Sequence, residues 1–209
     1  MTQQIRLGVL GCGNVGAALV KLVAAQADGI EARTGVRLEV TKVAVRNLSA
    51  PREVDLPEGV LTRDAHAVVA DPDIDVVVEV IGGIEPAREL IVTALRNGKP
   101  VITANKELLA NVGTELYAAA DEAGVDLLFE AAVAGGIPVI RALRESLRGE
   151  PVRRVMGIIN GTTNFILTKM TEEGTDYTAA LAEAQALGYA ERDPTADVDR
   201  KSTRLNSSH

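Results

Sequence analysis

The chain has 209 residues, of which 46% are hydrophobic and 24% charged, and its formal net charge is −7. This composition is typical of a globular protein with one large domain, or one domain and part of a second. Aromatic residues make up only 2% and basic residues form no stripe, which argues against nucleic-acid binding.

Cys12 is the only cysteine, so an internal disulfide is impossible and a reducing compartment fits. The N-terminus lacks the pattern of a signal peptide, and no apolar run approaches the ~20 residues of a membrane span. We therefore expect a cytoplasmic protein without a membrane anchor. The two histidines, His66 and His209, lie in polar surroundings, so proton chemistry is expected to use Lys, Asp or Glu.

Strands and helices alternate through residues 1–148, which we expect to form one domain. The strands are apolar on both faces, which is typical of a parallel sheet covered on both sides. We predict a doubly wound α/β sheet of the Rossmann type. The expected strands cover 5–11, 38–45, 75–83, 100–105 and 125–136, and the expected helices cover 14–26, 86–99, 113–124 and 137–149.

The pattern changes after Gly149. Residues 152–160 read as a strand, and helical patterns follow at 161–174 and 176–190. We expect residues 149–199 to be the start of a second, α+β domain. The longest stretch with a loop composition is 47–59.

The segment "GCGNVG" places Gly11, Gly13 and Gly16 in the spacing G-x-G-x-x-G, directly after a strand and at the start of a helix. In dinucleotide-binding folds the first glycine allows a tight turn, the second lets the pyrophosphate approach the backbone, and the third lets helix and strand pack closely. A glycine-rich turn without a ligand is the alternative. We expect Gly11, Gly13, Asn14, Val15 and Gly16 to contact the cofactor.

The end of the second strand indicates which cofactor binds. An acid there would bind the ribose 2′-hydroxyl of NAD, but the sequence has Arg46 in "AVRNLS". A guanidinium suits a 2′-phosphate, so NADP is favoured and NAD remains possible. An ordinary solvated arginine at a strand end is the alternative.

Four further segments make the sequence specific: "VVVEVIGGIEPARELIVTALRNGKPVITANKELLA", "FEAAVAGGIPVI", "GIINGTTNFILTKM" and "GYAERDPTADV". In this order they resemble the homoserine dehydrogenase family, from about residue 5 to residue 199. No aspartokinase segment precedes the first strand, so the resemblance is to the monofunctional type. It implies NAD(P)-dependent interconversion of L-aspartate 4-semialdehyde and L-homoserine, a step toward threonine and methionine, in a parent enzyme that forms a homodimer.

The resemblance also implies roles for single residues. Lys106 in "TANKELLA" corresponds to a lysine that contacts cofactor and substrate, and we take it as a catalytic candidate. Gly188 corresponds to a cofactor-contacting glycine, and Glu191 to a glutamate that binds homoserine. "NGTTN" (160–164) is a family hallmark expected to shape the site, with helix capping by Thr163 or Asn164 as the alternative.

A monovalent-cation loop is implied by the same resemblance. Glu130, Val133, Gly135 and Ile137 match positions that hold a sodium ion through a carboxylate and backbone carbonyls. Hard oxygen donors on a glycine-rich backbone suit such an ion. The alternative is a loop in which Glu130 pairs elsewhere.

The last ten residues, "RKSTRLNSSH", depart from the family pattern. The family continues with a glycine and a helix carrying a substrate-binding Asp and, four residues later, a proton-donating Lys. Those two positions fall on Ser202 and Asn206 in this sequence, and Arg200 replaces the glycine. We therefore interpret 149–199 as the incomplete beginning of the substrate-binding and dimerisation domain, and 200–209 as a non-native tail.

Three functional hypotheses follow. The chain is an N-terminal part of a homoserine dehydrogenase, or it is an NADP-binding module without activity of its own. The third hypothesis, a different semialdehyde or dicarboxylate reductase, requires a catalytic Cys or His in the cleft. Cys12 in the phosphate turn and His66 in a helix are not expected to meet that requirement.

Overall fold

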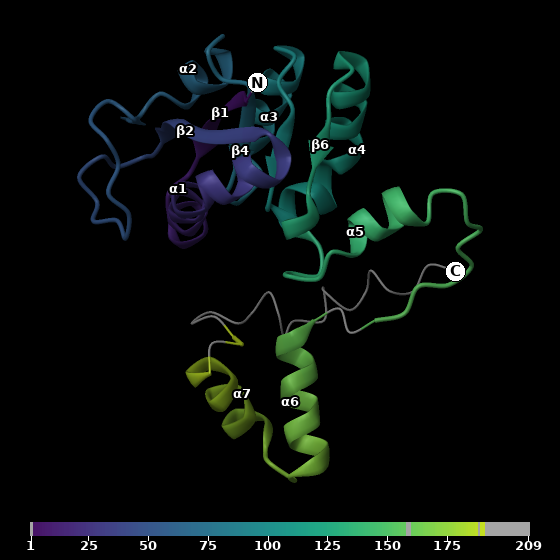
Figure 1. Ribbon diagram of the computed structural model, residues 1–209. Helices are drawn as coiled ribbons and strands as arrows, with labels where there is room; N and C mark the ends of the chain where they lie inside the picture. Colours follow the sequence, from purple (N-terminus) through teal and green to yellow (C-terminus); the bar gives the residue numbers. More distant parts are fainter. Residues whose placement is uncertain (1, 158–159, 188, 191–209) are drawn as a thin grey trace. The chain divides into compact units, whose positions relative to one another are not determined.

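The computed structural model describes residues 2–157, 160–187, 189 and 190. Contacts divide the chain into two compact units, Met1–Gly149 and Glu150–His209. The first unit is built on a six-stranded parallel sheet with the order β3-β2-β1-β4-β5-β6 (Figure 1). This order, with strand 1 at the reversal point, is that of doubly wound dinucleotide-binding folds. The predicted fold class is therefore confirmed.

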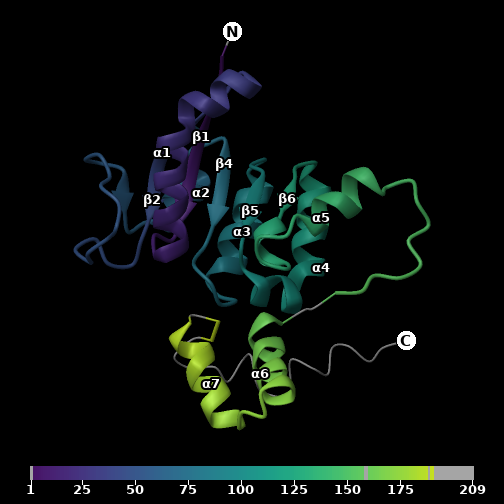
Figure 2. The same ribbon diagram turned by 60° about the horizontal axis from the view of Figure 1, so that its bottom comes forward.

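The strands can be followed side by side in Figure 2. They are β1 (Gln3–Leu10), β2 (Val36–Ala44), β3 (Leu61–Thr62), β4 (Val76–Glu79), β5 (Val101–Thr103) and β6 (Leu127–Leu128). The connecting helices are α1 (Asn14–Thr34), α2 (Ala65–Ala70), α3 (Ala87–Arg96) and α4 (Lys106–Ala123). Glycines at positive φ, Gly35 and Gly124, end α1 and α4.

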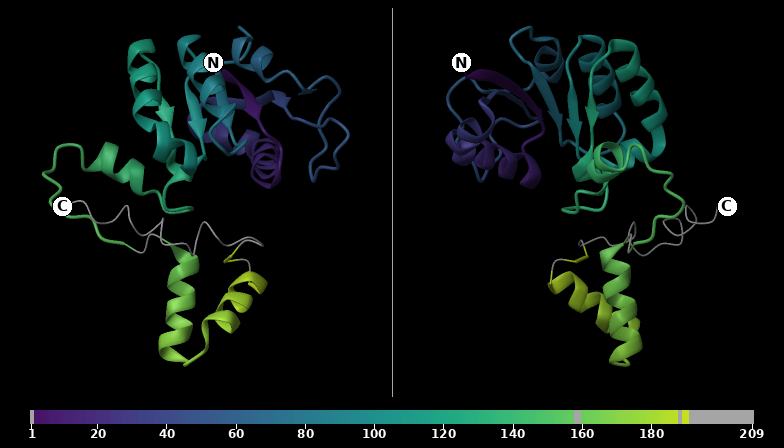
Figure 3. Two further views of the ribbon diagram at one scale, coloured as in Figure 1. Left: turned by 180° about the vertical axis from the view of Figure 1, so that it is seen from behind. Right: turned by 45° about the vertical axis from the view of Figure 1, so that its right-hand side comes forward.

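Alternate residues of the central strands β1 and β4 enter two different cores. Leu10, Val77 and Val101 pack with α2, α3 and α4, while Val9 and Val78 pack with α1 on the other face. Figure 3 shows these helices around the sheet from behind and from one side. Strands that are buried on both faces read as continuous apolar runs, which is why the sequence pattern identified them.

The second unit contains a pair of packed helices, α6 (Gly161–Glu172) and α7 (Tyr177–Ala186), visible in green and yellow in Figure 3. Ile166 packs against the small residues Ala180 and Ala184, so the two backbones approach closely. Lys169 pairs with both Glu173 and Glu183 at 2.9 Å, which adds a polar link between the helices. Among the described residues, no helix is long and apolar enough to cross a membrane.

Several expected elements differ from the structure. The strand expected at 152–160 is absent over 152–157, and 158–159 lie outside the described residues. Its pattern is strand-like, but no strand is described elsewhere in the second unit to pair with it, and Val155 and Met156 are largely exposed. The helix expected at 137–149 is only a short α5 (Val139–Arg141) followed by a short π-helix (Ala142–Ser146).

Candidate functional site

The candidate site lies at the edge of the sheet where the parallel strands end. β1 and β4 are neighbours at the reversal point of the strand order, and the loops that follow them face the same cleft. Ligands of doubly wound sheets bind at this place. The cleft has a volume of about 800 Å³ and is lined by Gly11, Cys12, Gly13, Ala44, Val45, Arg46, Asn47, Ala50, Arg52, Arg63, Asp64, Ala65, His66, Val80, Ile81, Gly82, Glu85, Pro86 and Leu90.

The three glycines of the turn have three different environments. Gly11 has φ 102°, a conformation that L-residues avoid, and a Cβ on it would lie 2.8 Å from the carbonyl oxygen of Val80. A Cβ on Gly16 would lie 2.3 Å from the carbonyl oxygen of Gly11. A Cβ on Gly13 would meet no atom within 4 Å. The fold therefore requires the first and third glycines, whereas only an approaching ligand gives the second a reason to be glycine.

The turn also leaves the start of α1 open to an anion. Gly13 is the N-cap and has no side chain with which to cap the helix, and the first turn carries no acid. Asn14 and Val15 are exposed there, and Gly16 is buried against the turn. Backbone N–H groups and the helix dipole favour a phosphate at such a terminus. The residues present thus fit a dinucleotide pyrophosphate.

Cationic side chains lie beside this turn. Arg46 is exposed and lines the cleft just after β2, as expected. β3 pairs with β2 through Val43↔Leu61 and Ala44↔Thr62, so the exposed Arg63, directly after β3, joins Arg46 in the cleft lining. Among the described residues, no carboxylate lies within ion-pair distance of either guanidinium.

Sequence reasoning missed Arg63 because it missed β3. The strand is only two residues long, but "GVLTRDAH" carries signals: β-branched residues followed by Asp64, which caps α2 by accepting from Ala67 N at 2.8 Å. Arg52 was missed as well. Its guanidinium donates to the carbonyl oxygens of Leu48 at 3.0 Å and Ala50 at 2.8 Å, so it holds the 47–52 loop together.

That neither Cys12 nor His66 is a catalytic residue stays a prediction, but the structure brings both side chains to the cleft. Both line it, because α2 begins right after β3 and places His66 in its first turn. Burial raises the pKa of the Cys12 thiol, and the Arg52 guanidinium opposes this only in part. The thiol is therefore protonated at neutral pH and is a weak nucleophile.

Lys106 is exposed and begins α4, immediately after β5 and its connecting residues. It does not line the cleft, so the structure does not bring it into direct contact with the glycine turn. Asn105 links the two regions, because its Nδ2 donates to the carbonyl oxygen of Gly83 at 2.6 Å in the loop after β4. Its Oδ1 caps α4 by accepting from Leu108 N at 3.1 Å.

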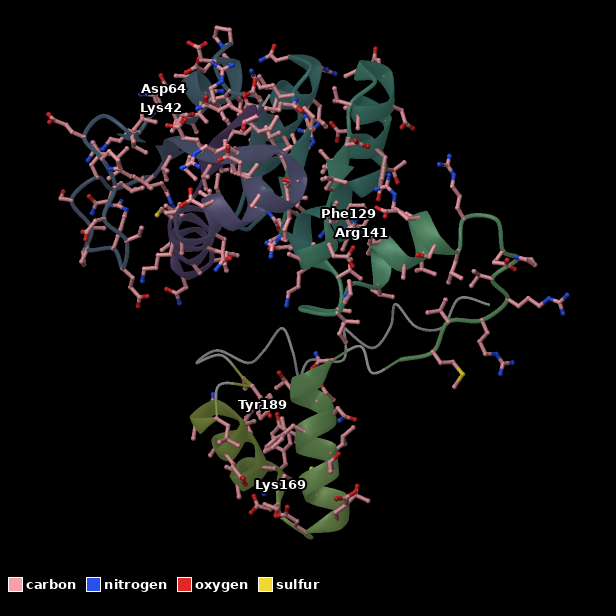
Figure 4. All side chains as sticks on the ribbon, in the orientation of Figure 1. Lys42, Asp64, Phe129, Arg141, Lys169 and Tyr189 are labelled. Carbon is pink, nitrogen blue, oxygen red and sulfur yellow. The ribbon has the colours of Figure 1, made fainter. Side chains whose placement is uncertain are left out.

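The loop from Glu130 to Ile137 lies between Phe129 and Arg141, which are labelled in Figure 4. The Glu130 carboxylate accepts from Ile140 N at 3.0 Å and from Arg141 N at 2.8 Å. Ala134 and Gly135 both have positive φ, 58° and 60°. A non-glycine residue held in this region carries backbone strain, which concentrates at functional loops. Among the described residues, no group of three or more His, Cys, Asp and Glu is placed to hold a metal ion.

In the second unit, "NGTTN" begins α6, and the cap is Asn160 rather than Thr163 or Asn164. Asn160 Oδ1 accepts from Thr163 N at 2.8 Å. The hydroxyl of the buried Thr162 donates to the carbonyl oxygen of Tyr189, which is labelled with Lys169 in Figure 4. Gly188, Glu191, Ser202 and Asn206 lie outside the described residues.

Comparison with known proteins agrees with this geometry. The family model described as "Homoserine dehydrogenase, NAD binding domain" matches residues 11–130, and the model "Homoserine dehydrogenase" matches residues 138–203. This chain belongs to the homoserine dehydrogenase family. It is 51% identical over 195 residues to the homoserine dehydrogenase of Bacillus subtilis and 53% identical to that of Corynebacterium glutamicum.

The alignments cover 93% of this chain and 44–45% of those two enzymes, so the chain spans about half the length of the curated relatives it matches. Among solved structures, the homoserine dehydrogenase of Thiobacillus denitrificans has a TM-score of 0.85 and 47% identity, over 97% of this chain and 47% of that one. A hyperthermophilic archaeal homoserine dehydrogenase in complex with NADPH has a TM-score of 0.81 and 30% identity, over 97% of this chain and 67% of that one. Residues 11–130 thus belong to the NAD(P)-binding domain of this family.

Proposed function

We propose that this chain supplies the cofactor site and part of the substrate site for interconversion of L-aspartate 4-semialdehyde and L-homoserine, with NADP preferred over NAD. The observation that carries the proposal is that the glycine turn after β1 and Arg46 after β2 line one cleft. A dinucleotide whose pyrophosphate lies at the turn extends its adenosine ribose toward the end of β2. Arg46 is the cation placed there for a 2′-phosphate.

The remaining assignments belong to the same proposal. A bound nicotinamide cofactor supplies the hydride that the aldehyde carbon of the substrate accepts. Lys106, at the start of α4, contacts cofactor and substrate, and Glu191 pairs with the substrate ammonium. Gly188 contacts the cofactor. The hydroxyl of Thr162 holds the backbone at Tyr189, which lies between Gly188 and Glu191 in the sequence.

Cofactor preference is tested by titrating NADPH and NADH into the chain and following fluorescence. A charge-assisted hydrogen bond is worth about 1.5–3 kcal/mol, so NADPH should bind roughly 10- to 150-fold more tightly than NADH. Arg46→Ala should abolish the preference. Arg33→Ala removes an exposed arginine from the last turn of α1, outside the cleft, and should leave the preference for NADPH intact. Equal affinities for the two cofactors would refute the NADP assignment.

We infer in addition that Glu130 and the carbonyl oxygens of Val133, Gly135 and Ile137 hold a sodium ion. The donor set consists of hard oxygens, and two consecutive residues at positive φ shape the loop. Sodium chloride should raise the melting temperature by about 2–4 °C over a bulky-cation chloride of equal ionic strength, which corresponds to about 1 kcal/mol. Glu130→Gln should remove the difference; a difference that persists shows that Glu130 is not a ligand.

The second candidate function is that of an NADP-binding module without catalytic activity. The observation that favours this candidate is the presence of Ser202 and Asn206 at two positions where the family has ionisable residues. At these positions the family has a substrate-binding Asp and a proton-donating Lys. General acid catalysis contributes ~10²–10⁴-fold, so we expect this chain not to oxidise homoserine detectably. The assay follows NADPH formation at alkaline pH. Turnover at the rate of a full-length family member would mean that Lys106 alone carries the proton chemistry.

A further inference from the structure

The loops that follow β4 and β5 are joined by a closed ring of hydrogen bonds. Glu79, the last residue of β4, is fully buried. Its Oε1 accepts from the backbone N–H groups of Ile81 at 2.8 Å and Gly82 at 3.2 Å. Its Oε2 accepts from the hydroxyl of Thr103 at 2.6 Å. One carboxylate therefore holds its own loop and the end of the neighbouring strand.

Asn105 closes the ring on the other side. Its backbone N–H donates to Thr103 Oγ1 at 3.0 Å, and its side-chain amide reaches back to the carbonyl oxygen of Gly83 at 2.6 Å. Thr103 is fully buried and Asn105 is 6% exposed. Hydrogen bonds join Glu79 to Thr103, Thr103 to Asn105, and Asn105 to Gly83. The backbone from Gly83 back to Glu79 completes the ring.

The pairing of β4 with β5 does not require this acid. The strands already pair through Val77↔Val101, Val78↔Ile102 and Glu79↔Thr103, and an apolar side chain is the usual occupant of such a position. A buried carboxylate without a cation costs free energy unless hydrogen bonds compensate it. The three donors described above compensate for the burial of the Glu79 carboxylate, and two of them fix the course of the loop after β4.

The two sides of the ring lead to two parts of the site. Ile81 and Gly82 line the cofactor cleft, whereas Asn105 caps α4, which begins at Lys106. Neither Glu79 nor Thr103 lines the cleft. We propose that Glu79 is a positioning residue that ties the cleft-lining loop to the helix start carrying Lys106. The inference rests on the proposed function in taking Ile81 and Gly82 to face the cofactor and Lys106 to act with it.

The first test uses amide hydrogen exchange on the ligand-free chain and needs no cofactor. Thr103→Val removes the hydroxyl and keeps the side-chain shape. We expect exchange at Ile81 and Gly82, two hydrogen bonds away from the substituted atom, to accelerate about tenfold together with exchange at Leu108. Thr103→Ser restores the hydroxyl and should return all three amides close to their original rates.

The matched control is Lys99→Met, which removes a buried polar group at the opposite edge of the sheet. It should destabilise the chain without selective acceleration at Ile81, Gly82 and Leu108, measured relative to the core amide of Leu10. Acceleration confined to 105–108 in Thr103→Val, with Ile81 and Gly82 unchanged, overturns the inference. If Thr103→Val does not fold, Glu79→Gln is used instead. Unchanged exchange at Leu108 in Glu79→Gln likewise overturns the inference.

The second test separates positioning from a purely structural role. Acetylation of the exposed Lys106 is measured by peptide mass spectrometry with and without NADPH, with Lys21 on α1 as the internal reference. NADPH should slow acetylation of Lys106 in the original chain. In Thr103→Val the protection should fall at least threefold at saturating NADPH, and Thr103→Ser should recover it. Equal protection of Lys106 in all three forms overturns the proposal that the ring positions Lys106. A chain that binds no NADPH refutes the proposed function, and the hydrogen-exchange test alone then decides whether the ring ties the two segments together.

Discussion

The two edges of the parallel sheet differ in what their buried polar groups hold. At the edge where the strands begin, Lys99 is 6% exposed and its Nζ donates to the carbonyl oxygens of Asp71 at 2.6 Å and Ile74 at 2.7 Å. Arg6 pairs there with Asp75. At the edge where the strands end, the buried Glu79 fixes a loop beside an open cleft.

The difference leads us to expect that side chains facing the cleft at the second edge affect binding, whereas the buried polar groups at the first edge affect stability. The charges at the first edge contact backbone and acids that belong to the fold itself, so a change there alters the free energy of unfolding. The groups at the second edge leave donors and cations facing the cleft, so we expect a change to one of those groups to alter ligand affinity. Substitutions matched between the edges test whether this separation holds.

The largest effect is expected from Gly16→Ala. The added Cβ would lie 2.3 Å from the carbonyl oxygen of Gly11, and a backbone atom cannot yield as a flexible side chain can. Overpacking costs about 1–3 kcal/mol and occasionally more, so unfolding by urea should show a loss of about 3 kcal/mol, and NADPH affinity should fall at least ~100-fold as the turn shifts.

The matched variant of the same turn is Gly13→Ala, which has open space around the new Cβ. Its stability should stay within about 0.5 kcal/mol of the original chain, while NADPH affinity falls about tenfold or more because the methyl group occupies the ligand's approach. Loss of stability in Gly13→Ala comparable with that in Gly16→Ala would contradict the distinction between the two glycines.

Lys99→Met should have the largest effect at the other edge. It leaves the carbonyl oxygens of Asp71 and Ile74, one part-buried and one buried, without their charged donor, and hydrogen bonds to charged groups are worth about 1.5–3 kcal/mol each. We expect the free energy of unfolding to fall by about 3 kcal/mol, with NADPH affinity unchanged within twofold. Arg96→Met, an exposed cation at the end of α3, serves as the control and should change neither quantity.

Arg63→Ala should have a smaller effect than Lys99→Met, and we expect it on NADPH affinity rather than on stability. The side chain is exposed in the cleft lining and has no carboxylate partner among the described residues, so stability should not change. Loss of one attraction to a phosphate should weaken NADPH binding about three- to tenfold, and NADH binding less. The measurement is the same fluorescence titration; equal weakening for both cofactors would place Arg63 away from the 2′-phosphate.

The smallest expected effect concerns pH. Hydrogen bonds from Arg6 hold the pKa of Asp75 below its usual range. The stabilisation is therefore present above the unfolded-state pKa near 4 and is lost as pH falls through the lowered folded-state pKa. Asp75→Asn should cost about 1 kcal/mol or less at pH 7, since the pair is partly solvated, and should flatten the acid side of the stability curve. An unchanged slope between pH 5 and 2 would exclude this role.

Local patterns were enough to predict much of the first unit. β1, β2, β4 and β5 are short apolar runs between turn signals, and the glycine spacing lies in the strand–turn–helix context that makes it informative. β3 and β6 have two residues each, too short to show a period, so β3 was missed and β6 was predicted too long. The strand expected at 152–160 has the composition of a strand, but its formation depends on a partner that local sequence does not specify.

The position of a candidate site residue was predictable where a single segment determines it. It was not predictable where the position depends on contacts between segments that are distant in the sequence. Arg46 was found from its place after the second strand. Arg63 was not, because its position depends on the pairing of β3 with β2. Glu79 stands in "VVVEVIGG" and reads as one polar residue in an apolar strand; its significance depends on Thr103 and Asn105 from the next strand and helix.

The positions of Arg46 and Arg63 have a consequence for how this protein can change over time. Both follow the outer strands β2 and β3, whereas the ring of Glu79, Thr103 and Asn105 joins β4 and β5 on the other side of β1. No hydrogen bond of the ring involves either arginine. If both proposals hold, mutations after β2 and β3 can exchange one dinucleotide for the other in natural or engineered descendants of this sequence, while the hydrogen-bonded ring between β4 and β5 is inherited unaltered.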